Sequence, residues 1–241
     1  MSWQIFQKEF QKKFEVMIIG HRGAFFEATQ NTIRAFELAV ECGAEMVEFD
    51  VHSTKDGHVV IIHDRTTEKV SDVHMDVQKS TLAEVQKVPL HGGHTIPTLD
   101  ELFKKFKGKL YFQIEIKQAG IASEVLSVID KHDLYDQCII SSFNHDDLAS
   151  YRDSKKSLLI ALLQDTSKGL IKKTLDMGMD GIHPEYNVVT PELVSEAHSN
   201  NLFVNTWTAD RKKSWEHLIR CGVDGIMTNN PRKLHKFLKS G

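Results

Sequence analysis

The residues of this chain that are best suited to chemistry are two carboxylates in the run Met46-Val47-Glu48-Phe49-Asp50-Val51. Apolar residues alternate with Glu48 and Asp50, so a strand here would point both carboxylates to the same face. In a strand covered by protein on both sides, two unpartnered carboxylates are strongly unfavourable or take up protons. A divalent cation bound between them would remove that penalty. A solvated edge strand with two exposed acids is the alternative, and this stretch alone leaves both open.

Five further polar residues stand at the ends of apolar, β-type runs: His21, Arg22, His63, Glu115 and Lys117. A third carboxylate, without a cysteine ligand, favours a hard cation such as Mg²⁺ or Ca²⁺ over zinc, with Mn²⁺ also open. The guanidinium can bind a phosphate through two hydrogen bonds, and the lysine can bind it as a point charge. Two histidines that titrate near neutral pH can divide the proton transfers. Together these residue types predict metal-assisted cleavage of a phosphodiester.

The elements that would position these side chains alternate along the chain. Helical patterns separate eight β-type runs, at residues 16–20, 46–51, 109–116, 138–141, 158–163, 181–183, 202–206 and 224–227. Eight parallel strands close a barrel, and in such barrels the chemistry lies at the carboxyl ends of the strands. We therefore expect an α/β fold, a single-domain (β/α)8 TIM barrel over residues 1–241.

One further strand is expected outside the eight. The tripeptide Lys55-Asp56-Gly57 is a hairpin signal, which predicts that residues 58–62 return antiparallel to 46–51 and bring His63 alongside Glu48. Residues 65–97 are polar and irregular, so we expect a long loop insertion after the second barrel strand, with a short helix near 81–88.

The composition limits the classes of partner. The 241 residues are 41% hydrophobic and 26% charged, with a formal net charge of -3, which is ordinary for a globular protein and disfavours nucleic acid. The apolar runs are far shorter than the roughly 20 residues that a spanning helix needs, so we expect no stable membrane insertion and a cytoplasmic location. Three widely spaced cysteines suit reduced thiols: Cys42, Cys138 and Cys221. Four aromatic residues near the N-terminus either cover the barrel bottom or form a partner surface: Trp3, Phe6, Phe10 and Phe14.

The order of these motifs resembles the glycerophosphodiester phosphodiesterase family over nearly the whole chain. The matching motifs are His21-Arg22-Gly23, Asn31-Thr32, Glu48-Phe49-Asp50-Val51, Thr54-Lys55-Asp56-Gly57, His63-Asp64, Glu115-Ile116-Lys117, Ser142-Phe143, His183-Pro184, Trp207-Thr208 and Asp224-Gly225-Ile226-Met227-Thr228-Asn229. The resemblance implies hydrolysis of small glycerophosphodiesters, such as glycerophosphocholine or glycerophosphoethanolamine, to sn-glycerol 3-phosphate and an alcohol. It also implies one divalent cation, and it leaves a homo-oligomer open.

The resemblance further implies roles for particular residues. Those carried over by position are Glu48, Asp50 and Glu115 as metal ligands, His21 and His63 as general acid and base, and Arg22 and Lys117 as ligands of the phosphoryl oxygens. Two residues at the ends of later strands complete the expected substrate-binding set. His183 is expected to line the pocket, with a surface or core position as the alternative, and Trp207 either forms a wall for the substrate or belongs to the core.

One position departs from the family pattern. The family usually has Pro-Glu-Asn-Thr before the first helix, whereas this chain has Thr29-Gln30-Asn31-Thr32, so a negative charge is missing. Gln30 is the feature that favours a third hypothesis, a barrel that binds phosphodiesters without turnover. The enzymatic alternative is a lysophospholipase D or a related phosphodiesterase acting on a lipid. It would need an apolar rim at the mouth, which the polar segment 65–97 does not offer.

Overall fold

A closed barrel of eight parallel strands forms the centre of the computed structural model, which describes residues 16–154 and 158–240. The barrel strands are β1 (Met17–His21), β2 (Met46–Ser53), β4 (Tyr111–Ile116), β5 (Cys138–Ser142), β6 (Leu159–Gln164), β7 (Gly181–Pro184), β8 (Phe203–Thr206) and β9 (Gly225–Thr228). The first strand closes the barrel, because Ile19 pairs with Met46 of β2 on one side and with Met227 of β9 on the other. The eight predicted barrel strands are confirmed. The four aromatic residues expected at the barrel bottom, Trp3, Phe6, Phe10 and Phe14, lie outside the described residues.

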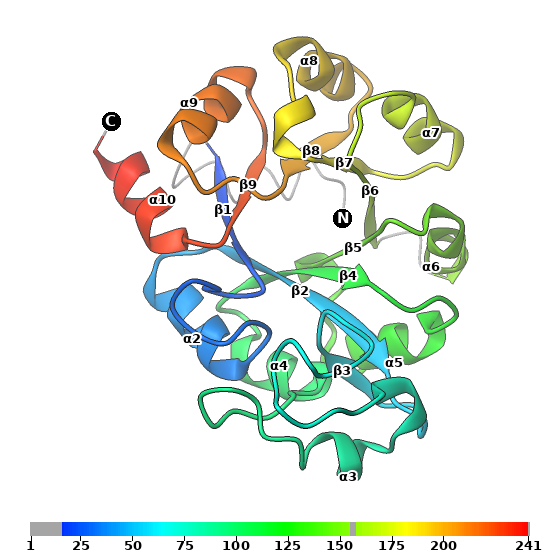
Figure 1. The fold of residues 1–241 in the computed structure, drawn as a ribbon. Coiled ribbons are helices and arrows are strands. Elements are labelled where there is room, and N and C mark those ends of the chain that lie inside the picture. The colour runs from blue at the N-terminus through cyan, green and yellow to red at the C-terminus, as the bar shows by residue number, and fades with distance from the viewer. Residues whose placement is uncertain (1–15, 155–157, 241) are drawn as a thin grey trace.

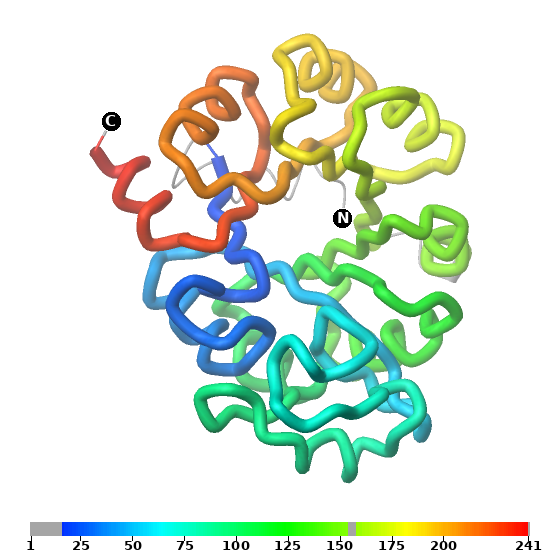
Figure 2. Tube along the Cα trace, in the orientation of Figure 1, coloured from blue at the N-terminus to red at the C-terminus, as the bar shows by residue number. Residues whose placement is uncertain are grey.

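Helices surround the strands (Figure 1). They are α2 (Ile33–Glu41), α4 (Leu99–Phe106), α5 (Ala122–His132), α6 (Leu148–Ser154), α7 (Leu170–Asp176), α8 (Pro191–Ser199), α9 (Lys212–Cys221) and α10 (Pro231–Lys239). Short 3₁₀ turns precede some strands and helices: η2 (Tyr135–Gln137), η3 (His145–Asp147) and η4 (Tyr186–Val188). Figure 2 follows the chain once around the barrel and shows its blue beginning beside its red end. Of the described helices, none is long and apolar enough to cross a membrane.

Local sequence explains where several helices begin. Thr98 and Glu101 form a capping box at the start of α4, in which each side chain accepts a hydrogen bond from the backbone N–H of the other residue. At α8 the side chain of Thr190 caps the helix and Pro191 occupies its first position. Helix α2 begins at Ile33, because the side chain of Thr32 caps it by accepting a hydrogen bond from the N–H of Ala35.

The predicted hairpin is present outside the barrel. Strand β3 (Val59–Ile61) pairs antiparallel with β2, and the N–H of Ile62 donates to the carbonyl of Asp50 at 3.0 Å, which returns His63 to the barrel mouth. Between β3 and α4 the chain forms η1 (Val77–Lys79) and a single helical turn, α3 (Leu82–Val85). This segment has its own small core, which includes Val60, Val77 and Ile96.

The barrel interior changes from apolar to polar towards the carboxyl ends of the strands. A cluster of buried apolar side chains fills much of the interior and reaches the mouth at Met227; its members are Met17, Ile19, Met46, Ile139, Leu159, Ala161, Phe203 and Met227. Further along β2 the inward positions are Glu48 and Asp50, which are 1% and 0% exposed. The alternation of residues along β2 therefore points both carboxylates into the enclosed interior of the barrel. This excludes the alternative of a solvated edge strand with two exposed acids.

Candidate active site

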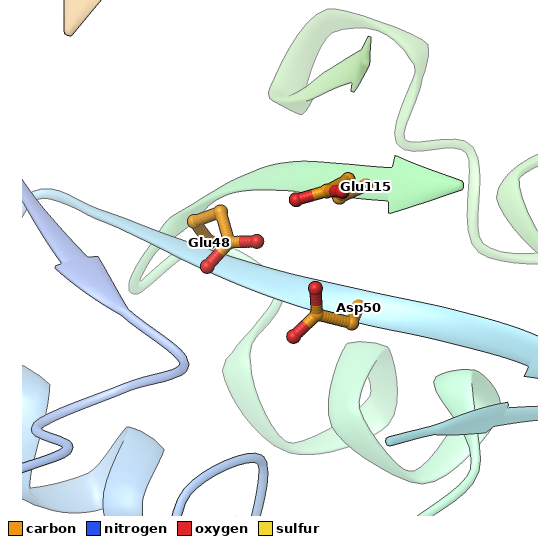
Figure 3. Close-up of side chains that lie close together, drawn as sticks. All are labelled: Glu48, Asp50 and Glu115. Atoms are coloured by element: carbon orange, nitrogen blue, oxygen red, sulfur yellow. The ribbon is translucent and has the colours of Figure 1, made fainter. Parts of the chain in front are cut away.

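Three carboxylates from two adjacent strands converge at the barrel mouth. Asp50 of β2 is paired in register with Glu115 of β4, and Glu48 lies two residues earlier on β2. Glu48, Asp50 and Glu115 each offer an oxygen within 4.8 Å of the others (Figure 3). The three side chains are buried. This is the arrangement that the alternation in the sequence predicts.

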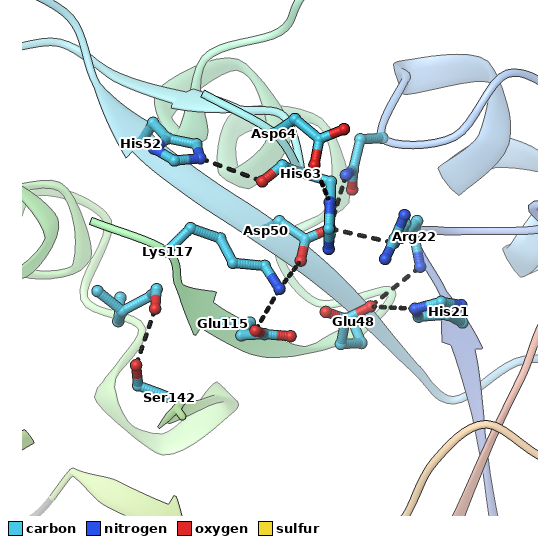
Figure 4. Close-up of polar contacts among 12 residues, drawn as sticks. His21, Arg22, Glu48, Asp50, His52, His63, Asp64, Glu115, Lys117 and Ser142 are labelled. Atoms are coloured by element: carbon cyan, nitrogen blue, oxygen red, sulfur yellow. Dashed lines mark hydrogen bonds and ion pairs between the residues drawn. The ribbon is translucent and has the colours of Figure 1, made fainter. Parts of the chain in front are cut away.

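Two cationic side chains lie beside the carboxylates (Figure 4). Lys117 Nζ is 3.2 Å from Asp50 Oδ1 and also pairs with Glu115. Arg22 Nε is 3.2 Å from Asp50 Oδ2, and the backbone N–H of Arg22 donates to Glu48 Oε2 at 3.1 Å. Arg22 has a φ of 51°, in the left-handed region, which directs both its backbone N–H and its side chain to β2.

The electrostatics of this cluster follow from burial and charge. Burial and the neighbouring Asp50 raise the pKa of Glu48 well above its usual range, and the pKa of Glu115 is raised to about 7 for the same two reasons. Burial also acts to raise the pKa of Asp50, but Lys117 and Arg22 outweigh it, and this pKa is lowered. Two of the three carboxyl groups therefore resist ionisation unless further positive charge is present.

The residues fit a hard divalent cation. Among the residues that the structure describes, Glu48 Oε1 is buried without a hydrogen-bond partner, so this oxygen is free to coordinate an ion, while Asp50 Oδ1 has the Lys117 ammonium as its neighbour. The donor set consists of oxygens alone, which suits Mg²⁺, Ca²⁺ or Mn²⁺ better than a thiolate-seeking metal. The ionised triad exceeds its two cationic neighbours by one negative charge, and a divalent cation would reverse that sign.

Each of the two predicted histidines has one ring nitrogen held by a neighbour. His21 Nδ1 is 2.6 Å from the side-chain oxygen of Asn229, and His21 Nε2 lies 3.9 Å from Glu48 Oε2. His63 Nδ1 is 2.8 Å from Asp64 Oδ1. Burial, together with the charge of Arg22, lowers the pKa of His21 to about 4, and burial also lowers the pKa of His63.

A cavity of about 140 Å³ opens between these groups. Its titratable lining residues are His21, Arg22, His63, Glu115 and Lys117, and its other lining residues are Phe143, Leu163, Trp207, Thr208 and Met227. The rings of Phe143 and Trp207 meet edge to face at 5.4 Å between centroids. The indole N–H of Trp207 donates to the carbonyl of His183 at 2.7 Å, which holds this ring against the cavity.

His183 does not line this cavity. Its side chain is 0% exposed inside the barrel and packs near the ring of Phe203, at 5.7 Å between centroids. Burial alone lowers its pKa to about 3, so the ring is neutral. His183 pairs in register with Leu163, which does line the cavity, but tilted strands place paired residues at different depths along the barrel axis.

Several residues outside the predicted catalytic, metal-binding and substrate-binding set also support the site. Asn31 donates to Asp50 Oδ2 at 2.9 Å, and Gln30 accepts a hydrogen bond from Arg22 Nη1. Asn229 contacts His21 and is itself held by Asp210. Asn31 and Asn229 belong to motifs of the resemblance, so the sequence contained a signal for them. Asp210 had none, since its partner Asn229 is 19 residues away on a different strand end.

Several known proteins are similar to this chain in sequence and in fold. The sequence profile of the glycerophosphoryl diester phosphodiesterase family matches residues 21–233. A glycerophosphodiester phosphodiesterase of Caldanaerobacter subterraneus subsp. tengcongensis is 35% identical over 243 residues, covering 94% of this chain and 99% of that protein. The structure of a glycerophosphodiester phosphodiesterase from Parabacteroides distasonis matches with a TM-score of 0.83 at 27% identity, over 95% of this chain and 98% of the other.

A fold comparison adds a phosphodiesterase of Oleispira antarctica, solved in complex with its product sn-glycerol-3-phosphate. It matches with a TM-score of 0.87 at 22% identity, over 92% of this chain and 96% of the other. At this level of identity the match supports the fold alone. The family profile covers most of the chain, and it includes both strands that carry the carboxylates. The chain therefore belongs to the glycerophosphoryl diester phosphodiesterase family.

Proposed function

We propose that this protein hydrolyses small glycerophosphodiesters to sn-glycerol 3-phosphate and an alcohol. The observation that carries the proposal is one cavity at the barrel mouth lined by two histidines, two cationic side chains and a carboxylate of the buried triad. Membership of the family supports this reaction, and so does the name of the relative that is 35% identical over nearly the whole chain. The Oleispira complex indicates that this fold can hold the product.

Glu48, Asp50 and Glu115 would hold one divalent cation, Mg²⁺, Ca²⁺ or Mn²⁺. Such an ion, when bound, polarises a phosphoryl oxygen and offsets the charge that develops on it. Arg22 and Lys117 bind the remaining phosphoryl oxygens, since both already reach the mouth beside Asp50. A divalent cation gives the cluster one net positive charge, which matches a singly charged phosphodiester.

The two histidines have different hydrogen-bond partners, and we use this difference to assign one proton transfer to each. Burial lowers the pKa of His63, but the carboxylate of Asp64 opposes this by stabilising the imidazolium, a partner that His21 lacks, so we assign to His63 the protonation of the leaving alkoxide. His21 bonds to a neutral amide and has its pKa lowered to about 4, so it is unprotonated at neutral pH. This imidazole accepts the proton of the attacking oxygen.

The aromatic wall suggests which alcohols fit. Phe143 and Trp207 line the same cavity as the histidines and the cationic side chains, so the alcohol portion of the diester would lie along their rings. Aromatic faces attract quaternary ammonium groups, which favours glycerophosphocholine over uncharged diesters. His183, being fully buried beneath the cavity, is left out of the substrate-binding set.

A lipid-directed phosphodiesterase is the second candidate. The apolar rim that this activity needs is absent from the polar segment 65–97, but Phe26 and Phe143, on the loops after β1 and β5, are 60% and 48% exposed. Two exposed aromatic rings next to the mouth could contact an acyl chain.

Release of sn-glycerol 3-phosphate from glycerophosphocholine, with Mg²⁺ and with EDTA, tests the proposal. We expect Mg²⁺-dependent release that is faster than the turnover of lysophosphatidylcholine. His63→Ala should lower kcat by about two to four orders of magnitude, the usual contribution of a positioned acid or base. His58→Ala on the same hairpin is the matched control, because its side chain is 54% exposed, lies near Asp56 in the turn and does not line the cavity. Binding without product would favour the non-catalytic barrel, and turnover of the lysolipid alone would favour the lipid enzyme.

A further inference from the structure

A chain of hydrogen bonds behind His21 leads away from the cavity to Asp210. Asn229, directly after β9, lies between the two residues. The side-chain oxygen of Asn229 is 2.6 Å from His21 Nδ1, and its side-chain NH₂ donates to Asp210 Oδ2 at 2.6 Å. The other carboxylate oxygen of Asp210 accepts from the backbone N–H of Asn229 at 2.7 Å and from the hydroxyl of Thr228 at 2.8 Å.

The direction of every bond in this chain follows from Asp210. An ionised carboxylate can only accept hydrogen bonds, so the NH₂ group of Asn229 must face Asp210 and its oxygen must face His21. An amide oxygen is also only an acceptor, so His21 must carry its proton on Nδ1. The orientation of the amide is therefore decided by the network around it.

This protonation leaves the other nitrogen of His21 unprotonated on the side of the site. Nε2 lies 3.9 Å from Glu48 Oε2, and His21 lines the cavity. We propose that Asp210 is a positioning residue that acts through Asn229 to fix His21 as the Nδ1–H tautomer, with Nε2 as the proton acceptor facing the cavity. The tautomer depends only on the hydrogen bonds, whereas its effect on turnover rests on the proposed function.

Exchange of one carboxylate oxygen for NH₂ gives a sharp test. In Asp210→Asn the oxygen of the new amide is retained by the backbone N–H of Asn229 and by Thr228, so its NH₂ faces the NH₂ of Asn229. Two donors repel, and the Asn229 amide relieves this by rotating its NH₂ towards His21. His21 Nδ1 then has to accept, which moves the proton to Nε2.

Long-range ¹H–¹⁵N correlation spectra of the ¹⁵N-histidine-labelled protein with Mg²⁺ report the tautomer directly. We expect Nδ1–H in the unmodified protein and Nε2–H in Asp210→Asn. With glycerophosphocholine, kcat should fall by about 100-fold or more with little change in KM, since a positioned base is lost while substrate contacts remain. Asp165→Asn, an exposed acid after β6 at the same end of the barrel, is the matched control and should change neither quantity.

The reciprocal variant Asp210→Asn/Asn229→Asp separates positioning from a merely structural role. Here the amide at 210 donates to the carboxylate at 229, which accepts from His21 Nδ1, so both the Nδ1–H tautomer and kcat should recover. If Asp210→Asn left both the tautomer and kcat unchanged, the proposal would be overturned. It would also be overturned if the reciprocal variant restored the Nδ1–H tautomer of His21 but kept the low kcat. Absence of glycerol 3-phosphate release by the unmodified protein would instead refute the proposed function, and the spectra would still decide the tautomer.

Discussion

Gln30 is the side chain at which a single charge distinguishes this site from the pattern that its family usually shows. Its side-chain oxygen accepts a hydrogen bond from Arg22 Nη1, next to the guanidinium that is proposed to bind the phosphoryl group. A neutral acceptor orients Arg22 without neutralising it. This chain therefore retains the three carboxylates and both histidines while offering more positive charge at Arg22 than a glutamate at position 30 would leave.

Substitution of Gln30→Glu should weaken substrate binding more than turnover. The added carboxylate would pair with Arg22 and compete with the phosphodiester, so we expect a several-fold higher KM for glycerophosphocholine and a smaller effect on kcat. Steady-state kinetics at fixed Mg²⁺ measure both values. Gln30→Leu is the control, since it removes the hydrogen bond without adding charge. Equal effects of the two substitutions would show that charge at position 30 is not the cause.

Glu115 carries a second expectation at the same scale. Glu115→Gln keeps the size of the side chain but weakens its oxygen as a metal ligand, so the Mg²⁺ concentration for half-maximal activity should rise, and excess Mg²⁺ should restore part of the rate. A Mg²⁺ titration of activity measures this. Glu196→Gln, an exposed residue on α8, should leave the titration unchanged. If no excess of Mg²⁺ restored any activity, Glu115 would not be a ligand.

At the scale of elements, the contact between β7 and β8 limits which side chains the barrel interior accepts. Gly181 pairs in register with Phe203, and a Cβ atom at Gly181 would lie 2.5 Å from the ring of Phe203. The backbone of Gly181 is not in the left-handed region, so the restriction is purely steric. The glycine leaves room for an aromatic ring that fills the apolar part of the interior below the site.

Gly181→Ala should therefore destabilise the barrel by about 1–3 kcal/mol, the usual effect of overpacking a core. Urea unfolding followed by circular dichroism gives the free energy of unfolding. The double variant Gly181→Ala/Phe203→Leu should recover part of the loss, because a smaller side chain at 203 admits the methyl group. A single variant as stable as the unmodified protein would mean that β7 and β8 can separate without penalty.

At the scale of the whole molecule, the buried triad couples pH, cation binding and stability. Glu115 has a pKa of about 7 in the folded protein and about 4.5 as its ordinary value, so the two states bind protons equally below about pH 4.5. Between these values the unfolded chain loses its proton first, and stability falls as the pH rises. The loss amounts to about 3 kcal/mol above pH 7 for this group in the absence of a cation. Glu48 acts in the same direction, whereas the lowered pKa of Asp50 opposes it.

A cation that binds the ionised triad should remove this loss. We expect the increase in Tm on adding Mg²⁺ to be larger at pH 8 than at pH 5, where protons compete with the ion. Differential scanning calorimetry at both pH values, with EDTA or Mg²⁺, measures the difference. Glu115→Gln should reduce the dependence on pH. A stabilisation by Mg²⁺ that is equal at both pH values would contradict the coupling.

Local signals were sufficient to predict the order of the elements. Alternating apolar residues marked the eight barrel strands, Lys55-Asp56-Gly57 marked the hairpin, and Thr98 with Glu101 marked the start of α4. Each of these patterns acts through neighbours a few residues apart, such as a turn, a helix cap or two side chains on one face of a strand. The convergence of Glu48 and Asp50 with Glu115 was predictable on a different ground, because the carboxyl ends of adjacent strands in a parallel barrel meet at one edge.

Depth in the barrel and contacts between distant strand ends were decided only by the tertiary structure. His21 and His183 both belong to barrel strands. Strand tilt nevertheless places His21 at the cavity and buries His183 below it. Asp210 and Asn229 meet because β8 and β9 are neighbours in the closed barrel, which no local pattern encodes. The sequence by itself determined the family, the elements and the chemical groups of the site, since these depend on residue types and short spacings. Closure of the barrel decided which groups face the cavity and which hold them there, because strand tilt and stagger are properties of all eight strands together.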